Sequence, residues 1–226
     1  MSIPDFNSAI TEEAWGKPAV SFDKDTDNTV KFDYNATCED VSADIYLRWD
    51  ATYLYVSRVS EDADLAGSAD SWVGDGIQFK VGKGETMPGD ALNIYVTLDA
   101  DAAGVTAGGG GASGYEKNIV VADGKLNVMV AVPFADLGIT AAAGEILTMS
   151  ALRISGTSDV PYAGWLAWGP FFGVGADTNP GVTDANLLVL GAAPVVEEPE
   201  VPEIPENAID TGKLDAAPDF SKPIND

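Results

Sequence analysis

Alternation of apolar and polar residues with a period of two runs through most of this chain and limits its possible folds. Residues 76–81 read GIQFKV, residues 92–98 LNIYVTL and residues 125–132 KLNVMVAV. Successive side chains of a strand point to opposite faces, so this period predicts β-strands with one apolar face. Further strands are predicted at 43–49 and 53–59, whose short separation indicates a hairpin, and at 146–155 and 186–190.

Helical signals are confined to two short segments, TEEAW at 11–15 and PFADLG at 133–138. Many strands separated by turns rich in Gly, Asp and Asn are typical of an all-β fold. We therefore predict an antiparallel β-sandwich of jelly-roll or immunoglobulin-like type with few short helical turns. The glycine-rich insert at 99–114 is expected to be a flexible loop between two strands.

Composition changes sharply near Ala193, where proline begins to alternate with Val, Ile and Glu. The prediction is a sandwich domain at 1–193 and a Pro/Glu-rich linker at 194–226 that favours extended polyproline II. Pro-Asp-Phe occurs at 4–6 and again at 218–220, which suggests that a following module starts there and that the parent protein holds tandem modules. This tail is expected to contact its own sandwich or a neighbouring module or chain.

The charge balance excludes several classes of partner and chemistry. Thirty-six acidic and 12 basic residues leave a formal net charge of −24. Such a surface repels nucleic acids and anionic membranes, so neither is an expected partner. The chain has no histidine, which removes Ser-His-Asp catalysis and histidine zinc sites. No pair of carboxylates stands out for glycoside hydrolysis, so we expect no enzyme activity.

The segment WVGDGIQF at 72–79 places a tryptophan in what is otherwise a loop pattern. Trp72 has two interpretations, a plug that closes one end of the core or an exposed platform for a flat ligand. Polar side chains on the strands that follow are predicted to face away from the apolar stripe, and the candidates for ligand contacts are Gln78, Asn93, Tyr95 and Arg153. Of Trp165 and Trp168, one is expected in the core and the other beside a cleft, and Trp168 is the candidate for ligand contact.

Five segments, in order, resemble the family 9 carbohydrate-binding modules and the wider DOMON-like sandwiches. They are ITEEAW at 10–15, the hairpin at 45–64, WVGDGIQF at 72–79, VAVPFADLGI at 130–139 and WLAWGPFFG at 165–173. The resemblance implies that Trp72 stacks on a sugar ring at the end of a sugar chain. An indole offers a rigid flat surface to the C–H face of a pyranose. This chain departs from the family pattern at Gln78, where the family has glutamate, and at 92–98, where the expected arginine is absent.

Acidic turns raise the question of a bound cation. Asp23, Asp25 and Asp27 begin like a calcium loop, but Asn28 and Tyr34 replace the glycine and glutamate of an EF-hand, which is thus rejected. A second acidic set, Asp62, Asp64 and Asp75, flanks Trp72, where modules of the resembled family hold a structural calcium. Each set by itself suits a solvated acidic surface; we expect at least one of them to hold calcium.

Together these patterns predict a non-catalytic carbohydrate-binding module of a secreted or cell-surface bacterial protein. Its partner would be an oligo- or polysaccharide and its cofactor a structural calcium ion. The alternative is a structural or adhesive module of a cell-surface or filament protein that keeps the fold without a sugar site.

Overall fold

The computed structural model describes most of the first 192 residues. The described ranges are 4–23, 25–26, 29–33, 42–62, 64–70, 73–99, 105–108, 114–157, 159, 164–168 and 186–192. The chain divides into two units, Met1–Pro194 and Val195–Asp226. The second unit lies outside the described residues, so the predicted linker, tail contact and following module stay predictions.

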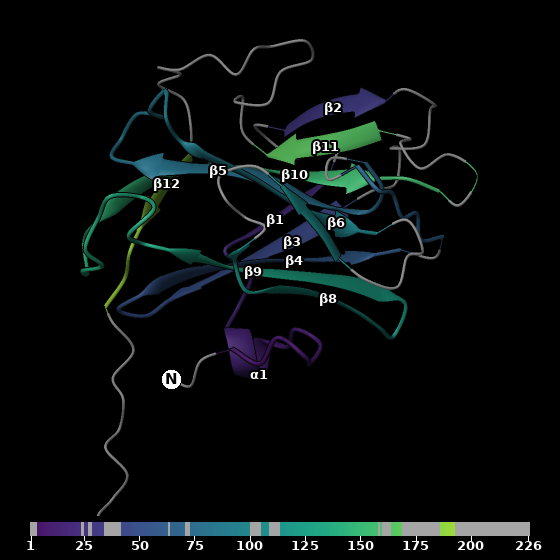
Figure 1. The fold of residues 1–226 in the computed structure, drawn as a ribbon, viewed down its shortest axis with the longest axis horizontal. Helices are drawn as coiled ribbons and strands as arrows, with labels where there is room; N and C mark the ends of the chain where they lie inside the picture. The colour runs from purple at the N-terminus through teal and green to yellow at the C-terminus, as the bar shows by residue number, and fades with distance from the viewer. Residues whose placement is uncertain are drawn as a thin grey trace, which may run out of the picture. The chain divides into compact units, whose positions relative to one another are not determined.

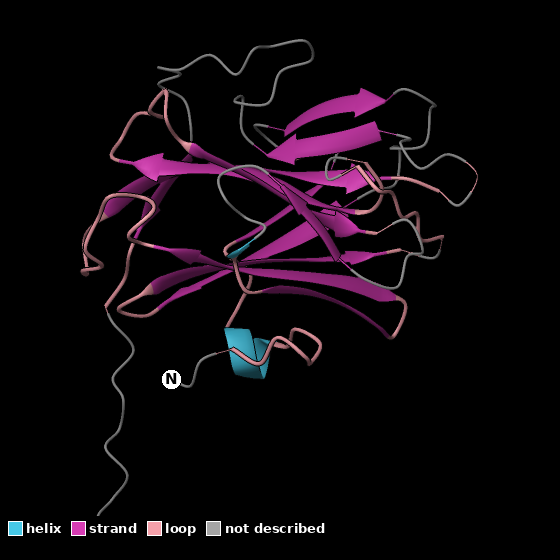
Figure 2. Ribbon diagram, viewed as in Figure 1, coloured by secondary structure: helices cyan, strands magenta, loops and turns pink. Residues whose placement is uncertain are grey.

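Twelve strands of the described chain form two antiparallel sheets (Figures 1 and 2). The first sheet has the order β1-β3-β4-β9-β8, formed by Val20–Asp23, Ser42–Trp49, Tyr53–Glu61, Lys125–Pro133 and Lys117–Ala122. The second has the order β2-β11-β10-β5-β6-β7, formed by Thr29–Asp33, Gly164–Trp168, Ile146–Ser155, Gly76–Lys83, Leu92–Leu98 and Val105–Gly108. Strand β12, Asn186–Val189, pairs with β10 in the second sheet. The predicted all-β sandwich is confirmed.

The main core lies between the two sheets. Strands β4 and β9 contribute Val56 and Val130, and strands β5 and β6 contribute Phe79 and Val96, all without exposed surface. Alternation places every second residue of these strands in this layer, and burial of that apolar surface is the main stabilising term. This arrangement makes the opposite face of each sheet available for other contacts.

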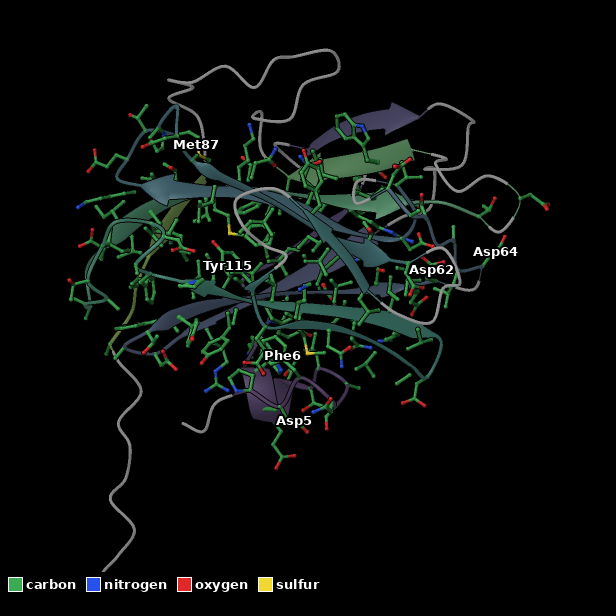
Figure 3. All side chains as sticks on the ribbon, in the orientation of Figure 1. Asp5, Phe6, Asp62, Asp64, Met87 and Tyr115 are labelled. Carbon is green, nitrogen blue, oxygen red and sulfur yellow. The ribbon has the colours of Figure 1, made fainter. Side chains whose placement is uncertain are left out.

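The N-terminal segment covers the outer face of the first sheet. Helix α1, Glu12–Trp15, begins after Thr11, whose hydroxyl accepts a hydrogen bond from the Ala14 N–H group. Trp15 and Phe6 pack on Tyr55 of β4 and neighbouring residues in a second buried cluster. Phe6 is labelled in Figure 3. Trp15 is thus buried beneath the N-terminal segment. No helix in the described ranges has the length and apolar character needed to span a membrane.

Five strands were not predicted from the alternation. They are β1, β2, β7, β8 and β11. The prediction of a flexible loop at 99–114 is wrong for residues 105–108, which form β7 and pair with β6. Short strands such as β7 carry little pattern of their own and form because a neighbouring edge supplies hydrogen-bond partners. The second short segment, residues 134–138, forms successive turns.

Candidate functional site

The segment after Trp72 is shaped by two glycines. Ser71 and Trp72 lie outside the described residues, so the choice between plug and platform stays open. Gly74 has φ +91°, a backbone conformation that favours glycine. At Gly76 an added Cβ would lie 2.3 Å from the Val96 carbonyl oxygen and 2.6 Å from the Thr97 Cα. Glycine is therefore required where β5 begins against β6.

Asp75, between these glycines, holds the loop from inside. Its side chain is fully buried, and its two oxygens accept hydrogen bonds from the Ala66 N–H (2.7 Å) and the Gly156 N–H (3.0 Å). Burial, followed by the charge of Asp62, raises the pKa of Asp75 to about 7. Asp75 thus joins three segments of the chain, at residues 66, 75 and 156.

Arg153 does not lie on the outer face, and its predicted placement there is wrong. It is 4% exposed and occupies an inward position on β10, opposite Ile77 of β5. Its Nη2 group lies 2.9 Å from the Asp62 carboxylate, and its Nη1 group donates to the Ser42 carbonyl at 3.1 Å. At this end of the sandwich the inward stripe carries charged groups that pair with each other, a change that alternation alone does not reveal.

The second acidic set is a poor match for calcium as the structure places it. Both Asp75 oxygens already accept backbone N–H groups, and Asp62 is paired with Arg153. Two buried arginines, Arg58 and Arg153, stand nearby and oppose a cation. Asp64 is exposed and lies at the same end as Asp62 (Figure 3).

The first acidic set is only partly described. Asp23 and Asp25 are exposed, and Asp23 Oδ1 accepts hydrogen bonds from the Asp25 N–H and the Thr26 hydroxyl, both at 2.9 Å. Asp27 lies outside the described residues. Across the ranges given above, no group of three or more acidic or cysteine side chains has a metal-binding arrangement. Calcium binding stays a prediction.

Three of the predicted ligand-contact residues do lie together on the outer face of the second sheet. Gln78 Nε2 donates to Asn93 Oδ1, and Asn93 Nδ2 donates to the Tyr95 hydroxyl, both at 2.9 Å. Gln78 pairs with Tyr95 in the register of β5 and β6, which brings these side chains side by side. All three are half-buried. We call Gln78, Asn93 and Tyr95 the polar strip.

Lys80 and Ser150 extend the polar strip toward β10. Lys80 is the next outward residue of β5 after Gln78, and its neighbours in the register are Asn93 and Ser150. Burial of Lys80, which is 7% exposed, lowers its pKa to about 8. The Ser150 hydroxyl is buried and has no hydrogen-bond partner among the described residues. The polar strip and these two neighbours together place amide, phenol, amine and hydroxyl groups on one face of the sheet.

The buried amine should make stability depend on pH. Between about pH 8 and 10.5 the unfolded chain holds the Lys80 proton while the folded chain releases it, so the free energy of unfolding should rise with pH. In the wild type this increase in the free energy of unfolding should be on the order of 2 kcal/mol across this pH window, and Lys80→Met should remove it. Urea unfolding at several pH values measures this pH dependence. Lys125→Met, at an exposed lysine, should keep the wild-type slope; an unchanged slope in Lys80→Met would contradict the prediction.

Apolar side chains border the polar strip on the same face. Met87, Leu152, Ile154 and Ala167 form a buried cluster there, and Tyr95 and Trp165 pack against it. Met87 comes from the turn between β5 and β6 (Figure 3). The outer face thus joins hydrogen-bonding groups to an apolar, partly aromatic surface.

Trp165, rather than Trp168, is the tryptophan of β11 that shares this face. Trp165 pairs with Ile154 in the register and packs against the outer cluster. Trp168 pairs with Ala151 and packs against the core between the sheets. One of the two tryptophans does pack against the core, as predicted, but it is Trp168, the residue predicted to contact a ligand. Residues three apart on a strand point to opposite faces of the sheet, so the formation of β11 separates the two side chains.

An open cleft of about 430 Å³ lies at the other end of β5. Lys83, Asp90 and Asp136 belong to its lining, together with Pro88 and Leu137 of two turns. None of the residues selected from the sequence lines it. The cleft is therefore separate from the polar strip.

Comparison with solved structures defines the class of fold. A family 9 carbohydrate-binding module from Caldicellulosiruptor kristjanssonii, solved in complex with cellotriose, has a TM-score of 0.62 at 12% identity. The match covers 88% of this chain and 95% of that one. A module of the same family and organism in complex with glucose has a TM-score of 0.57 at 14% identity, covering 79% and 92%.

The chain therefore has a fold like that of the family 9 carbohydrate-binding modules, as the resemblance in its sequence predicted. No protein-family model matches the chain, and no curated protein matches it at a significant level. The similarity lies in the fold, and the ligand must be argued from the residues on the outer face.

Proposed function

We propose that this protein is a non-catalytic carbohydrate-binding module whose ligand is an oligo- or polysaccharide. The observation that carries the proposal is the hydrogen-bonded polar strip of Gln78, Asn93 and Tyr95 beside the apolar cluster on one half-buried sheet face. Sugars present hydroxyl groups at their edges and C–H groups on their faces. A surface that offers amide groups next to apolar and aromatic side chains can contact both. The structural neighbours, which were solved with cellotriose and glucose, support this class of ligand.

Stacking on Trp72 belongs to the same proposal. Three residues separate Trp72 from the start of β5. Gly74 and Asp75 lie among them, and the hydrogen bonds of Asp75 fix the course of the chain there. Trp165 supplies a further aromatic side chain on the outer face. The module is proposed to act in a secreted or cell-surface protein, where polysaccharides are accessible.

Removal of the amide groups should weaken sugar binding without unfolding the protein. We expect Gln78→Ala and Asn93→Ala each to raise the Kd for a bound cello-oligosaccharide by roughly 2–10-fold, the effect of one lost neutral hydrogen bond. Trp72→Ala should cause a larger loss, of roughly 1–3 kcal/mol. Calorimetric titration with glucose and cello-oligosaccharides measures both effects.

The matched control for these variants is Asn7→Ala, which changes an exposed amide in the N-terminal turn. It should bind like the wild type. If no soluble glycan on an array binds the wild-type protein, the proposal fails and a structural or adhesive role becomes the better explanation. If Trp72→Ala melts far below the wild type, the indole belongs to the core and the stacking part alone fails.

Calcium is proposed as a structural ion, with the acidic loop that begins at Asp23 as its better candidate. An ion that binds only the folded state raises the melting temperature by mass action. We expect EDTA to lower the Tm by at least a few degrees, calcium to restore it and magnesium not to do so. The same melts on Asp25→Asn should show a smaller EDTA effect. A Tm that EDTA leaves unchanged would remove calcium from the proposal.

A further inference from the structure

Two buried arginines cross the space between the sheets in opposite directions. Arg58 belongs to β4 of the first sheet, and its Nη1 group donates to the Gly76 carbonyl of β5 at 2.6 Å. Arg153 belongs to β10 of the second sheet and reaches back to the carbonyls of Ser42 (3.1 Å) and Glu61 (3.3 Å). Both guanidinium groups therefore lie inside the sandwich at the end where β5 begins.

One edge of the Arg58 guanidinium has no acceptor. Its Nε and Nη2 groups are buried and find no hydrogen-bond partner within the described part of the chain. These two N–H groups point the same way and form the fork with which arginine binds carboxylates and other anions. Arg58 has no exposed surface, so bulk water cannot satisfy this edge.

No carboxylate of the described residues forms a direct ion pair with Arg58, although the charges of Asp75 and Asp62 act on it from nearby. Asp62 makes its ion pair with Arg153. Asp75 uses its two oxygens for the backbone N–H groups of Ala66 and Gly156. A buried charge without a paired partner is strongly unfavourable. An anionic acceptor on the unmatched Arg58 edge would stabilise this buried charge directly.

Two further unmatched donors lie at the same end. Ser60 follows Arg58 at the next inward position of β4; it is 4% exposed, and its hydroxyl has no partner within the described ranges. The Nε group of Arg153 is likewise buried and unmatched. Glu61, whose carbonyl accepts from Arg153, adjoins Ser60 in the chain. Unmatched donors from both sheets thus lie at the end of the sandwich where β5 begins.

We propose that a small inorganic anion of the halide class binds between the sheets, held by the Arg58 fork with the Ser60 hydroxyl and the Arg153 Nε group. A single-atom anion needs the least room in a closely packed interior, and it accepts hydrogen bonds from several directions. It would neutralise Arg58 and brace the sandwich beneath the loop that leads to the polar strip. This site is independent of sugar binding.

Thermal melts of the full 226-residue chain test the proposal in solution. Sodium chloride is titrated against sodium isethionate at constant ionic strength, because isethionate is too large for an interior site. The wild type should show a saturable Tm increase of roughly 2–4 °C with chloride. Arg58→Met should lose this increase and Ser60→Ala should reduce it, whereas Arg48→Met, at a half-buried arginine on the outer face of the first sheet, should keep it. Equal melts in both salts would overturn the proposal.

Bromide locates the ion directly and does not depend on the variants. Crystals of the wild type in millimolar bromide should show an anomalous peak within hydrogen-bond reach of Arg58 Nε and Nη2. Electron density of water without an anomalous signal at that position would overturn the proposal, and a peak that appears only at molar bromide would mean an adventitious ion only. If Arg58→Met does not fold, Ser60→Ala and the bromide map decide.

Discussion

Replacement of Gly76 by alanine should lower the free energy of unfolding by at least about 3 kcal/mol, at the upper end of the cost of overpacking. The added methyl group would lie 2.3 Å from the Val96 carbonyl oxygen and 2.5 Å from Thr97 Cγ2, on the neighbouring strand. The nearest atoms include backbone, so a side-chain rotation cannot relieve the clash. β5 and β6 would have to separate where their pairing begins, beside the loop that Asp75 holds.

Urea unfolding of Gly76→Ala and of Gly114→Ala provides the measurement and its control. A Cβ at Gly114 would meet no atom within 4 Å, so that variant should remain within about 0.5 kcal/mol of the wild type. If Gly76→Ala is as stable as Gly114→Ala, the close approach of β5 and β6 is not a constraint on this residue. Sugar binding of any folded Gly76→Ala protein should also weaken, because Gln78 lies two residues further along β5.

Replacement of Arg153 by methionine should be more damaging still, with a loss of about 3–5 kcal/mol, the range for breaking a buried pair from one side. Arg153 joins β10 to the Ser42 and Glu61 carbonyls and to the Asp62 carboxylate. Methionine fills part of the volume but leaves the carboxylate and both carbonyls without their donor. The unpaired Asp62 carboxylate should account for most of the lost stability, because its side chain is only 7% exposed.

A second substitution distinguishes the lost charge pair from lost packing. Asp62→Leu in the Arg153→Met background should restore part of the stability, because it removes the unpaired carboxylate. Arg48→Met serves as the matched control; Arg48 donates to the Ala14 carbonyl from the outer face of the first sheet and is half-buried, so its loss should cost about 1 kcal/mol or less. A double variant no more stable than Arg153→Met would show that the ion pair is not the source of the effect.

Resemblance and residue pattern together predicted much of the candidate site. Gln78, Asn93 and Tyr95 were selected because they alternate with apolar residues on two successive strands, and they do form one hydrogen-bonded strip. Arg153 was selected by the same reasoning but points inward. The difference is that a long charged side chain can occupy an inward position when another strand supplies its partner, here Asp62 after β4. Such a partner is 91 residues away in the chain.

The amino-acid sequence by itself determined the antiparallel sandwich, because a period of two specifies which side chains can share an apolar layer. It also determined that glycines flank Asp75. The tertiary structure alone decided which short segments became strands, as for β7 on the edge of β6, and which tryptophan of β11 faces the core. It alone placed Arg58 and Arg153 together between the sheets. These outcomes depend on contacts between distant parts of the chain, and local pattern carries no information about the partner that a side chain will meet.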